Sequence, residues 1–457
     1  MTNRVAVVLA AGEGKRMQSS LPKVLHSVCG KTLLGHVVSA VKAVCSQIIV
    51  VIGHKGDEVK KACGEQVHYV RQAQQLGTGH AVQQAEPLLP ASGTVFVLCG
   101  DTPLLTAETL QHLLAAHQEA QAAATILTAK VPEPFGYGRI VRDGGRVVKI
   151  VEEKDATAEE RKISEINTGT YIFDAQLLRE ALGKLHTNNA QGEYYLTDCI
   201  EELIRKDKVV TTYLLPDYRL ALGVNDRLQL AEAQAIMQKH INEKLMAAGV
   251  TMIDPQTAYI DADVKIGRDT VIMPNTVLRG ATQIGEQCII GPNSELIDCQ
   301  VGNEVVFRHS VAVKASLADK VTVGPFAHLR PETVLHSGVK VGDFVEIKKS
   351  DVGENTKIAH LAYVGDAQIG RKANLGAGTI IVNYDGRKKH LTIIGDEAFV
   401  GCNSNLVAPV TIGDGAFVAA GSTITKDVPA GALSLARAYQ VNKEGRAARL
   451  LKKKTDE

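Results

Sequence analysis

The stretch VLAAGEGKRMQSSLPK near the N-terminus combines glycines and cations in a way that suits phosphate binding. Gly12 and Gly14 let backbone N–H groups approach an anion closely. Lys15, Arg16 and Lys23 can neutralise the charge of that anion. An apolar run precedes the glycines, as expected for a buried strand that ends at a ligand. The stretch therefore predicts a loop that binds phosphate groups.

Two common phosphate-binding loops do not match this stretch. A Walker A loop requires Gly where this chain has Leu9, and it requires Ser or Thr where the chain has Arg16. The dinucleotide-binding fingerprint requires a third Gly, and Met17 stands at that position. A nicotinamide-dependent dehydrogenase is therefore disfavoured, and the loop is expected to bind phosphates in another way.

The composition of the 457-residue chain argues against several classes of function. Lys and Arg number 51 and Asp and Glu 50, so the net charge of +1 gives no sign of a nucleic-acid or membrane partner. The chain has no Trp, which argues against a base-stacking surface. Its eight cysteines include no Cys-x-x-Cys pair, which excludes the usual zinc spacings and a disulfide framework. Without a signal-peptide pattern or a long apolar run, we expect a soluble cytoplasmic protein without membrane insertion.

The first half of the chain alternates apolar strands with helical segments. RVAVVLAAG, QIIVVIG and TVFVLCGDTP read as buried parallel strands, and residues 34–44 and 107–119 read as helices. This alternation is typical of a doubly wound α/β sheet, whose ligands lie at the carboxyl ends of strands. Both the glycine loop and Asp101 follow such strand ends.

The periodicity changes after a long helical stretch. Residues 227–248 read as one helix that ends at Gly249, and we interpret this helix as a linker. The predicted domains are therefore residues 1–228, a linker helix over 229–249, and residues 250–457.

The second half repeats an aliphatic residue every six positions, usually followed by a small or polar residue. A hexapeptide repeat of this kind predicts a parallel β-helix in which three hexapeptides close one triangular coil. The repeating residues are Val323, Leu329, Leu335, Val341, Ile347, Val352, Ile358, Val364, Ile369, Leu375, Ile381, Ile394, Val400, Leu406, Ile412, Val418 and Ile424. The break at 382–393 is then an inserted loop, either part of a functional face or a tolerated surface insertion.

An ordered set of motifs resembles a known enzyme family. LAAGEGKRM…LPK, QLGTGHA, GDTPLL, GYGRI, EINTG and GVNDRLQL resemble the sugar-1-phosphate nucleotidyltransferases, although relatives usually carry Thr where this chain has Lys15. Joined to AHLAYVGD and NLGAGTIIVNYDG, the set resembles the bacterial bifunctional N-acetylglucosamine-1-phosphate uridyltransferases/glucosamine-1-phosphate acetyltransferases. This resemblance covers nearly the whole chain. It implies an α/β Rossmann-like nucleotidyltransferase domain, a linker helix and a left-handed parallel β-helix.

The resemblance also implies two reactions. The C-terminal domain would acetylate glucosamine-1-phosphate with acetyl-CoA. The N-terminal domain would then transfer a uridylyl group from UTP to N-acetylglucosamine-1-phosphate, with Mg²⁺ bound and pyrophosphate released. The product, UDP-N-acetylglucosamine, would feed peptidoglycan and lipopolysaccharide precursors. The family also implies a homotrimer, with acetyl-transfer sites between neighbouring β-helices.

Family positions can be assigned to the first site residue by residue. Asp101 and Asn225 would hold Mg²⁺, although the first could instead cap a turn and the second could cap the linker helix. Lys23 would bind the triphosphate, although a lysine after a proline could also be simply solvated. Cys99 replaces a common Tyr. The implied UTP and UDP-N-acetylglucosamine contacts are Leu9, Ala10, Ala11, Gly12, Arg16, Lys23, Gln72, Gly77, Thr78, Cys99, Gly100, Asp101, Gly138, Glu152, Asn167 and Asn225.

In the second site, His360 matches the family's general base, which suits a side chain that titrates near neutral pH. A solvated or capping histidine is the ordinary alternative. The implied glucosamine-1-phosphate contacts are Arg330, Lys348, Tyr363 and Asn374. The implied acetyl-CoA contacts are Ala377, Asn383, Tyr384, Cys402, Ala420 and Arg437, with Cys402 in place of the usual Ser. The basic C-terminal tail could reach the CoA phosphates or remain solvated.

Two rival functions share these modules. A nucleotidyltransferase with a purely regulatory β-helix would need neither His360 nor the inserted loop, and the chain has both. A non-catalytic scaffold would have no reason to keep Arg16, Lys23 and Asp101 together. Both rivals are therefore disfavoured.

Overall fold

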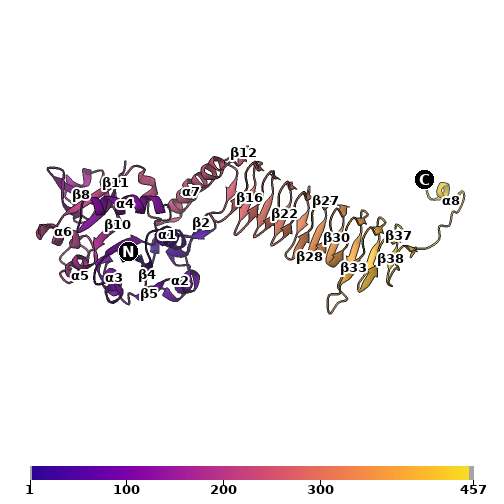
Figure 1. Ribbon diagram of the computed structural model, residues 1–457, viewed down its shortest axis with the longest axis horizontal. Coiled ribbons are helices and arrows are strands. Elements are labelled where there is room, and N and C mark those ends of the chain that lie inside the picture. The colour runs from indigo at the N-terminus through magenta and orange to yellow at the C-terminus, as the bar shows by residue number, and fades with distance from the viewer. Residues whose placement is uncertain (1–2, 452–457) are drawn as a thin grey trace, which may run out of the picture. The chain divides into compact units, whose positions relative to one another are not determined.

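The structure is a computed structural model that describes residues 3–451 (Figure 1). It divides into two compact units within helix α7 (Arg227–Ala247), after His240. This helix confirms the one predicted over 227–248. Gly249, just past its end, has φ +99°, a conformation that only glycine adopts easily.

The first unit is built on a nine-stranded sheet. Its main path runs β11-β7-β10-β6-β1-β4-β5, with β8 and β9 forming a hairpin paired to β10. The strands are β1 (Arg4–Ala10), β4 (Gln47–Ile52), β5 (His68–Arg71), β6 (Thr94–Cys99), β7 (Ala124–Lys130), β8 (Gly138–Asp143), β9 (Arg146–Val151), β10 (Glu165–Asp174) and β11 (Val210–Leu215). A separate small hairpin joins β2 (Ser27–Val28) to β3 (Lys31–Thr32).

The three strands predicted from apolar runs are confirmed as parallel neighbours. β1 pairs with β4 on one side and with β6 on the other. The sheet is mixed, however, because β10 runs antiparallel to both β6 and β7. The sequence pattern did not predict this reversal. It brings the start of β10 to the same sheet edge as the carboxyl end of β6.

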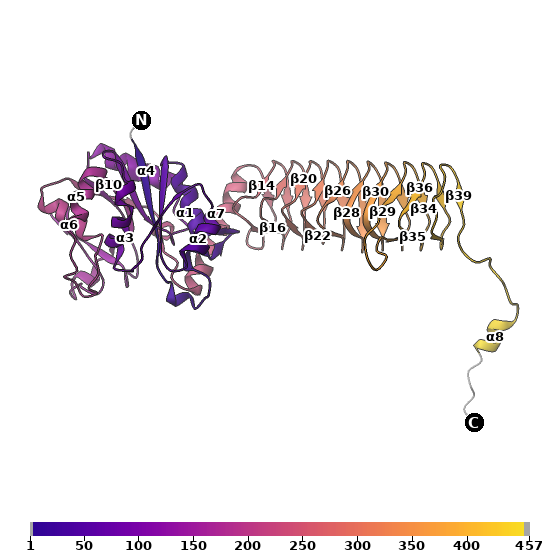
Figure 2. The ribbon, with the colours of Figure 1, turned by 90° about the horizontal axis from the view of Figure 1, so that it is seen from below.

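Helices cover both faces of this sheet (Figure 2). α1 (Leu33–Lys42) and α4 (Ala107–Glu119) pack on the face that carries Ala6 and Val8, whereas α3 (Thr78–Ala85), α5 (Ala175–Leu182) and α6 (Asp198–Arg205) pack on the opposite face. α2 (Gly56–Cys63) follows β4. Side-chain caps define several helix starts: Thr106 Oγ1, for example, accepts the Thr109 backbone N–H at 3.1 Å.

The second unit is a parallel β-helix from β12 (Thr251–Met252) to β39 (Leu433–Ser434). An eleven-stranded sheet forms one face, and a seventeen-stranded sheet forms the rest of the wall. Figure 2 shows the coils stacked in chain order. The strands that matter below are β25 (His328–Leu329), β27 (Lys340–Asp343), β28 (Glu346–Val352), β29 (Lys357–His360), β30 (Tyr363–Ile369), β31 (Asn374–Leu375), β32 (Ile380–Val382), β33 (Thr392–Ile394), β34 (Phe399–Val400) and β37 (Phe417–Val418).

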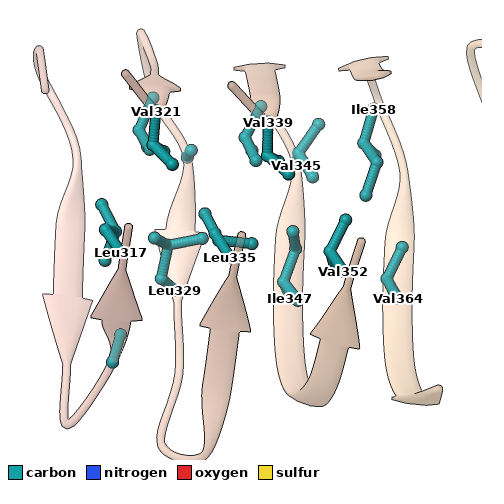
Figure 3. Packing of buried hydrophobic residues seen from close by; sticks show 14 of the residues in the cluster. Leu317, Val321, Leu329, Leu335, Val339, Val345, Ile347, Val352, Ile358 and Val364 are labelled. Carbon is teal, nitrogen blue, oxygen red and sulfur yellow. The ribbon is translucent and has the colours of Figure 1, made fainter. Parts of the chain in front are cut away.

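The aliphatic residues of the predicted hexapeptide repeat form the core of this unit. Each of them, from Val323 to Ile424, is at most 4% exposed. Figure 3 shows ten labelled residues of this core, Leu329, Ile347 and Val364 among them, directed into the coil interior. Because burying one such side chain contributes about 1.5–3 kcal/mol, the repeat itself stabilises the coil. The predicted inserted loop lies between β32 and β33 and widens one coil.

Candidate active sites

The glycine loop of the first unit leaves the carboxyl end of β1, beside the end of β6. Leu9 pairs with Cys99, and the Gly100 N–H donates to the Leu9 carbonyl at 2.8 Å. Ala10, Ala11 and Gly12 follow directly. Gly14 has φ +65°, and a Cβ there would lie 2.6 Å from Lys23 Cβ, so glycine permits the loop to fold back onto Lys23.

Four predicted residues meet in one polar cluster. Lys23 Nζ forms an ion pair with Asp101 and donates to Asn225 Oδ1 at 3.2 Å. Arg16 donates to the same Asn225 oxygen at 2.9 Å. The Lys23 and Asp101 side chains are only 16% and 18% exposed, which contradicts a merely solvated lysine. Asp226, rather than Asn225, accepts the capping N–H of α7, from Gln229 at 2.9 Å.

The donor set of this cluster fits Mg²⁺. Asp101 Oδ2 and Asn225 Oδ1 converge on one position, where the Lys23 ammonium lies. Mg²⁺ prefers oxygen ligands and usually takes only one or two carboxylates from the protein, with waters and substrate phosphates completing its shell. Within residues 3–451 there is no group of three or more His, Cys, Asp or Glu side chains suited to a metal.

Gln72 directly follows β5, and its side-chain amide is held by hydrogen bonding. The residue is 4% exposed, and Nε2 donates to the Gly77 carbonyl at 3.0 Å and lies 3.1 Å from His80 Nδ1. The hydrogen bond to Gly77 uses one amide proton and orients the Gln72 side chain. Thr78 Oγ1 accepts the Leu196 N–H at 3.1 Å and so anchors this segment.

The predicted sugar-contacting residues also lie together. Gly138 of β8 pairs with Asn167 of β10, and a Cβ at Gly138 would lie 3.3 Å from the Glu152 carboxylate. Asn167 Nδ2 donates to the Tyr171 hydroxyl at 2.6 Å. Burial raises the pKa of Glu152. Burial also raises the pKa of Cys99 to about 12, so this thiol stays neutral at physiological pH.

A buried ion pair beside the sugar residues was not predicted from the sequence. Arg139, with a side chain 2% exposed, donates to Glu153 Oε2 at 2.7 Å. The same oxygen accepts the Gly136 N–H at 3.1 Å, so the pair fixes the loop that leads into Gly138. The arginine of GYGRI was visible as part of a motif, but nothing in the sequence identified Glu153 as its partner.

We expect Glu153→Ala to destabilise the first unit by about 3 kcal/mol, because it leaves the Arg139 guanidinium buried without a counter-charge. A loss of that size lowers the melting temperature of a unit of this length by roughly 6–12 °C, measurable by scanning calorimetry. Glu159→Ala, which removes an exposed pair with Lys162, is the matched control and should change little. If both variants lowered the melting temperature by the same small amount, Glu153 would not be the counter-charge that stabilises buried Arg139.

In the second unit, His360 lies in a row along one corner of the β-helix. It pairs in register with Asp343 of the preceding coil. Continuing the registers of β29, β31, β34 and β37 by two residues places Ala377, Cys402 and Ala420 in the same row. The row beyond His360 thus consists of small side chains.

His360 is held by a carboxylate that sequence reasoning missed. Its Nδ1 lies 2.5 Å from Asp343 Oδ1. The side chains are 59% and 35% exposed, so the ring remains open to ligands. The hydrogen bond from His360 lowers the pKa of Asp343. Counting back one coil from His360 in the repeat could have identified this partner.

Three residues predicted to bind glucosamine-1-phosphate lie in adjacent coils along the seventeen-stranded sheet: Arg330, Lys348 and Tyr363. Arg330 donates to Glu346 Oε1 at 2.7 Å, and Lys348 occupies the equivalent position one coil further. Contact with the Lys389 ammonium lowers the pKa of Lys348, which marks a local excess of positive charge. In the next coil Tyr363 pairs in register with Glu346.

The inserted loop joins the same face. Asn383 Nδ2 donates to the buried Asp366 carboxylate at 2.6 Å. A Cβ at Gly365 would lie 2.6 Å from both Asn383 Nδ2 and the Tyr363 hydroxyl oxygen, so both groups pack against this glycine. Tyr384 is exposed and donates to the Gly386 carbonyl at 2.8 Å. The loop is thus anchored through Asn383 and presents Tyr384 to solvent.

Two predicted residues lie apart from this group. Asn374 pairs with Lys357 and Phe399 on the eleven-stranded sheet, so a single chain does not place it on the face of Arg330 and Lys348. Arg437 is exposed and lies over Gly421, next to the end of the corner row. The predicted basic tail is GRAARLLKKKTDE, residues 445–457; its described part, residues 445–451, is exposed and includes Arg446 and Arg449, whereas residues 452–457 lie outside the described residues.

None of the helices formed by residues 3–451 combines the length and apolarity needed to cross a membrane.

Family models match both units. Residues 6–165 match the MobA-like NTP transferase domain, and residues 263–297 and 391–426 match the bacterial transferase hexapeptide repeats. The chain is 54% identical over 447 residues to the bifunctional protein GlmU of Halalkalibacterium halodurans, covering 97% of this chain and 98% of that protein. It is 55% identical to the GlmU of Geobacillus sp. over 457 residues, covering 99% of this chain and 100% of that protein.

A third relative, the GlmU of Listeria welshimeri, is 52% identical over 453 residues and covers 98% of this chain and 99% of its own. Identity of this extent spans both units and the helix between them. The chain therefore belongs to the bifunctional GlmU family, which combines a uridylyltransferase and an acetyltransferase of UDP-N-acetylglucosamine synthesis in one polypeptide.

Proposed function

We propose that uridylyl transfer takes place at the Arg16–Lys23–Asp101–Asn225 cluster and acetyl transfer at His360. The observation that carries this assignment is that each polar cluster lies within its own unit, one in residues 3–240 and the other in 241–451. Two reactions with different chemical needs can therefore proceed on separate surfaces of one chain.

In the first reaction, a phosphate oxygen of N-acetylglucosamine-1-phosphate attacks the α-phosphorus of UTP and pyrophosphate leaves. Arg16 and Lys23 bind the triphosphate and neutralise its charge. Asp101 and Asn225 would hold Mg²⁺, which supplies charge stabilisation to the phosphates. Gln72 Oε1 accepts the imide N–H of uracil, while Gly138, Glu152 and Asn167 position the sugar.

In the second reaction, the amine of glucosamine-1-phosphate attacks the thioester carbonyl of acetyl-CoA. His360 accepts the amine proton and returns it to the departing CoA thiolate, so the proton balance closes. Arg330 and Lys348 bind the sugar phosphate, beside Tyr363. Acetyl-CoA lies along the row of Ala377, Cys402 and Ala420, with Asn383, Tyr384 and Arg437 at its borders.

We further infer a homotrimer and a cytoplasmic site of action. Asn374 lies on a different face from the other sugar-phosphate residues, as expected if neighbouring chains complete each site. Exposed apolar side chains at Phe326, Phe344 and Leu361 follow the His360 corner and could be covered by a second copy. The eight free cysteines suit a reducing compartment.

The direct test supplies glucosamine-1-phosphate, acetyl-CoA, UTP and Mg²⁺ to the purified protein. The expected products are CoA, UDP-N-acetylglucosamine and pyrophosphate. Omission of acetyl-CoA should abolish nucleotide-sugar formation, and added N-acetylglucosamine-1-phosphate should restore it. A protein that forms UDP-glucosamine without acetyl-CoA at a comparable rate would contradict the proposed order.

A further inference from the structure

Among the described residues of the second unit, three histidine–carboxylate pairs lie on the β-helix. They are His336–Asp351 at 2.9 Å, His360–Asp343 at 2.5 Å and His390–Asp385 at 2.7 Å. Of these, the His360–Asp343 pair lies at the head of the row of small side chains described above. This placement sets it apart from an ordinary surface ion pair.

The backbone fixes how the two side chains meet. Asp343 and His360 are direct register partners on β27 and β29, and the Leu361 N–H donates to the Asp343 carbonyl at 2.9 Å. Each is followed by a residue in the left-handed region, Phe344 with φ +56° and Leu361 with φ +49°. The two side chains therefore leave equivalent corners of adjacent coils, about 4.8 Å apart.

The hydrogen bond determines which ring nitrogen is free. A carboxylate can only accept hydrogen bonds, so His360 Nδ1 donates and Nε2 carries the lone pair. An aspartate is ionised at neutral pH, and the hydrogen bond from His360 lowers the pKa of Asp343 further. Extending the register of β29 and β31 places Ala377, an uncharged residue, beside His360 on its other side.

We propose that Asp343 is a positioning residue for acetyl transfer: it fixes the His360 tautomer and orientation and stabilises the imidazolium formed when Nε2 accepts the proton. The proposal rests on the proposed function of His360 as the base. Asp343 is the one ionised partner that these strands bring to the ring. The other charged residues of β27 and β29 are Lys340 and Lys357, three positions before the pair.

The test compares Asp343→Asn with wild type in the full chain. Asparagine can still accept the Nδ1 proton but carries no charge, so the acidic limb of kcat/KM for acetyl transfer should move to lower pH. We expect a shift of about half a pH unit, because the pair is partly exposed. The NMR titration midpoint of the His360 ring should move in the same direction. Asp351→Asn, which alters the His336 pair outside the site, should leave both unchanged.

A second variant tests orientation separately from charge. Asp343→Leu removes the acceptor and should lower kcat roughly 10-fold or more, with KM for acetyl-CoA nearly unchanged. If Asp343→Asn and wild type gave superimposable pH profiles and the same His360 midpoint, the proposal would be wrong. Because the base is tested independently by substituting His360 itself, an inactive His360→Asn protein with an unaffected Asp343→Asn protein would refute only the role of Asp343.

Discussion

Replacing His360 with asparagine is expected to lower kcat for acetyl transfer by about 10²–10⁴-fold. The substrate amine must lose a proton before the CoA thiolate leaves, and asparagine preserves polarity and approximate size but cannot take that proton. KM for acetyl-CoA should change little, since the row of small side chains beyond His360 is untouched. Uridylyl transfer to supplied N-acetylglucosamine-1-phosphate should continue at the wild-type rate.

His336→Asn is the matched control, because His336 is an exposed histidine of the same β-helix with its own carboxylate partner, Asp351. It should retain full activity in both assays. If the His360→Asn protein kept acetyl transfer within a few-fold of wild type, with the acidic limb of its pH profile intact, His360 would be a packing or capping residue rather than the base.

The second large effect is expected from Asp101→Ala. Removing a carboxylate that would hold Mg²⁺ and that pairs with Lys23 should lower uridylyl transfer by ~10³-fold, since charge stabilisation by a bound metal contributes several kcal/mol to the transition state. Acetyl transfer involves no phosphoryl chemistry and takes place on the other unit, so its rate should remain within about twofold. Separate assays of CoA release and pyrophosphate release distinguish the two outcomes.

Asp217→Ala provides the comparison, because it removes a carboxylate from an exposed ion pair with Arg219 in the same unit. This control should leave both reactions unchanged. Loss of both activities in a folded Asp101→Ala protein would contradict the separation of the sites, and undiminished uridylyl transfer would show that Asp101 has no part in it.

The β-helix could be predicted from the sequence almost residue by residue, because a stacked coil translates periodicity directly into burial. Each aliphatic residue of the six-residue repeat is buried inside the coil. The break in the repeat at 382–393 is an inserted loop between β32 and β33. The same regularity carries side chains outside the coil. Asp343 is the register partner of His360 in the preceding coil. It could have been identified from the sequence by applying the spacing of the repeat to polar residues as well as to aliphatic ones.

The first site was less accessible to sequence reasoning. The strand end predicted a ligand-binding role for Asp101, and the family resemblance implied that Lys23 and Asn225 belong to the same site; the contacts of the three residues agree with this. The reversal of β10 and the burial of Arg139 against Glu153 depend on tertiary packing, which leaves no periodic trace in the chain. The orientation of the Gln72 amide likewise depends on Gly77 and His80, neither of which signals a hydrogen bond by its type alone.

The most direct test of the two-site account is a complementation assay with glucosamine-1-phosphate, acetyl-CoA, UTP and Mg²⁺. Purified Asp101→Ala and His360→Asn proteins are assayed alone and in an equimolar mixture for UDP-N-acetylglucosamine. The first variant should accumulate N-acetylglucosamine-1-phosphate and the second should form almost no product, whereas the mixture should form the nucleotide sugar because the intermediate passes freely between proteins. A mixture that stayed inactive although both proteins were folded would contradict the account.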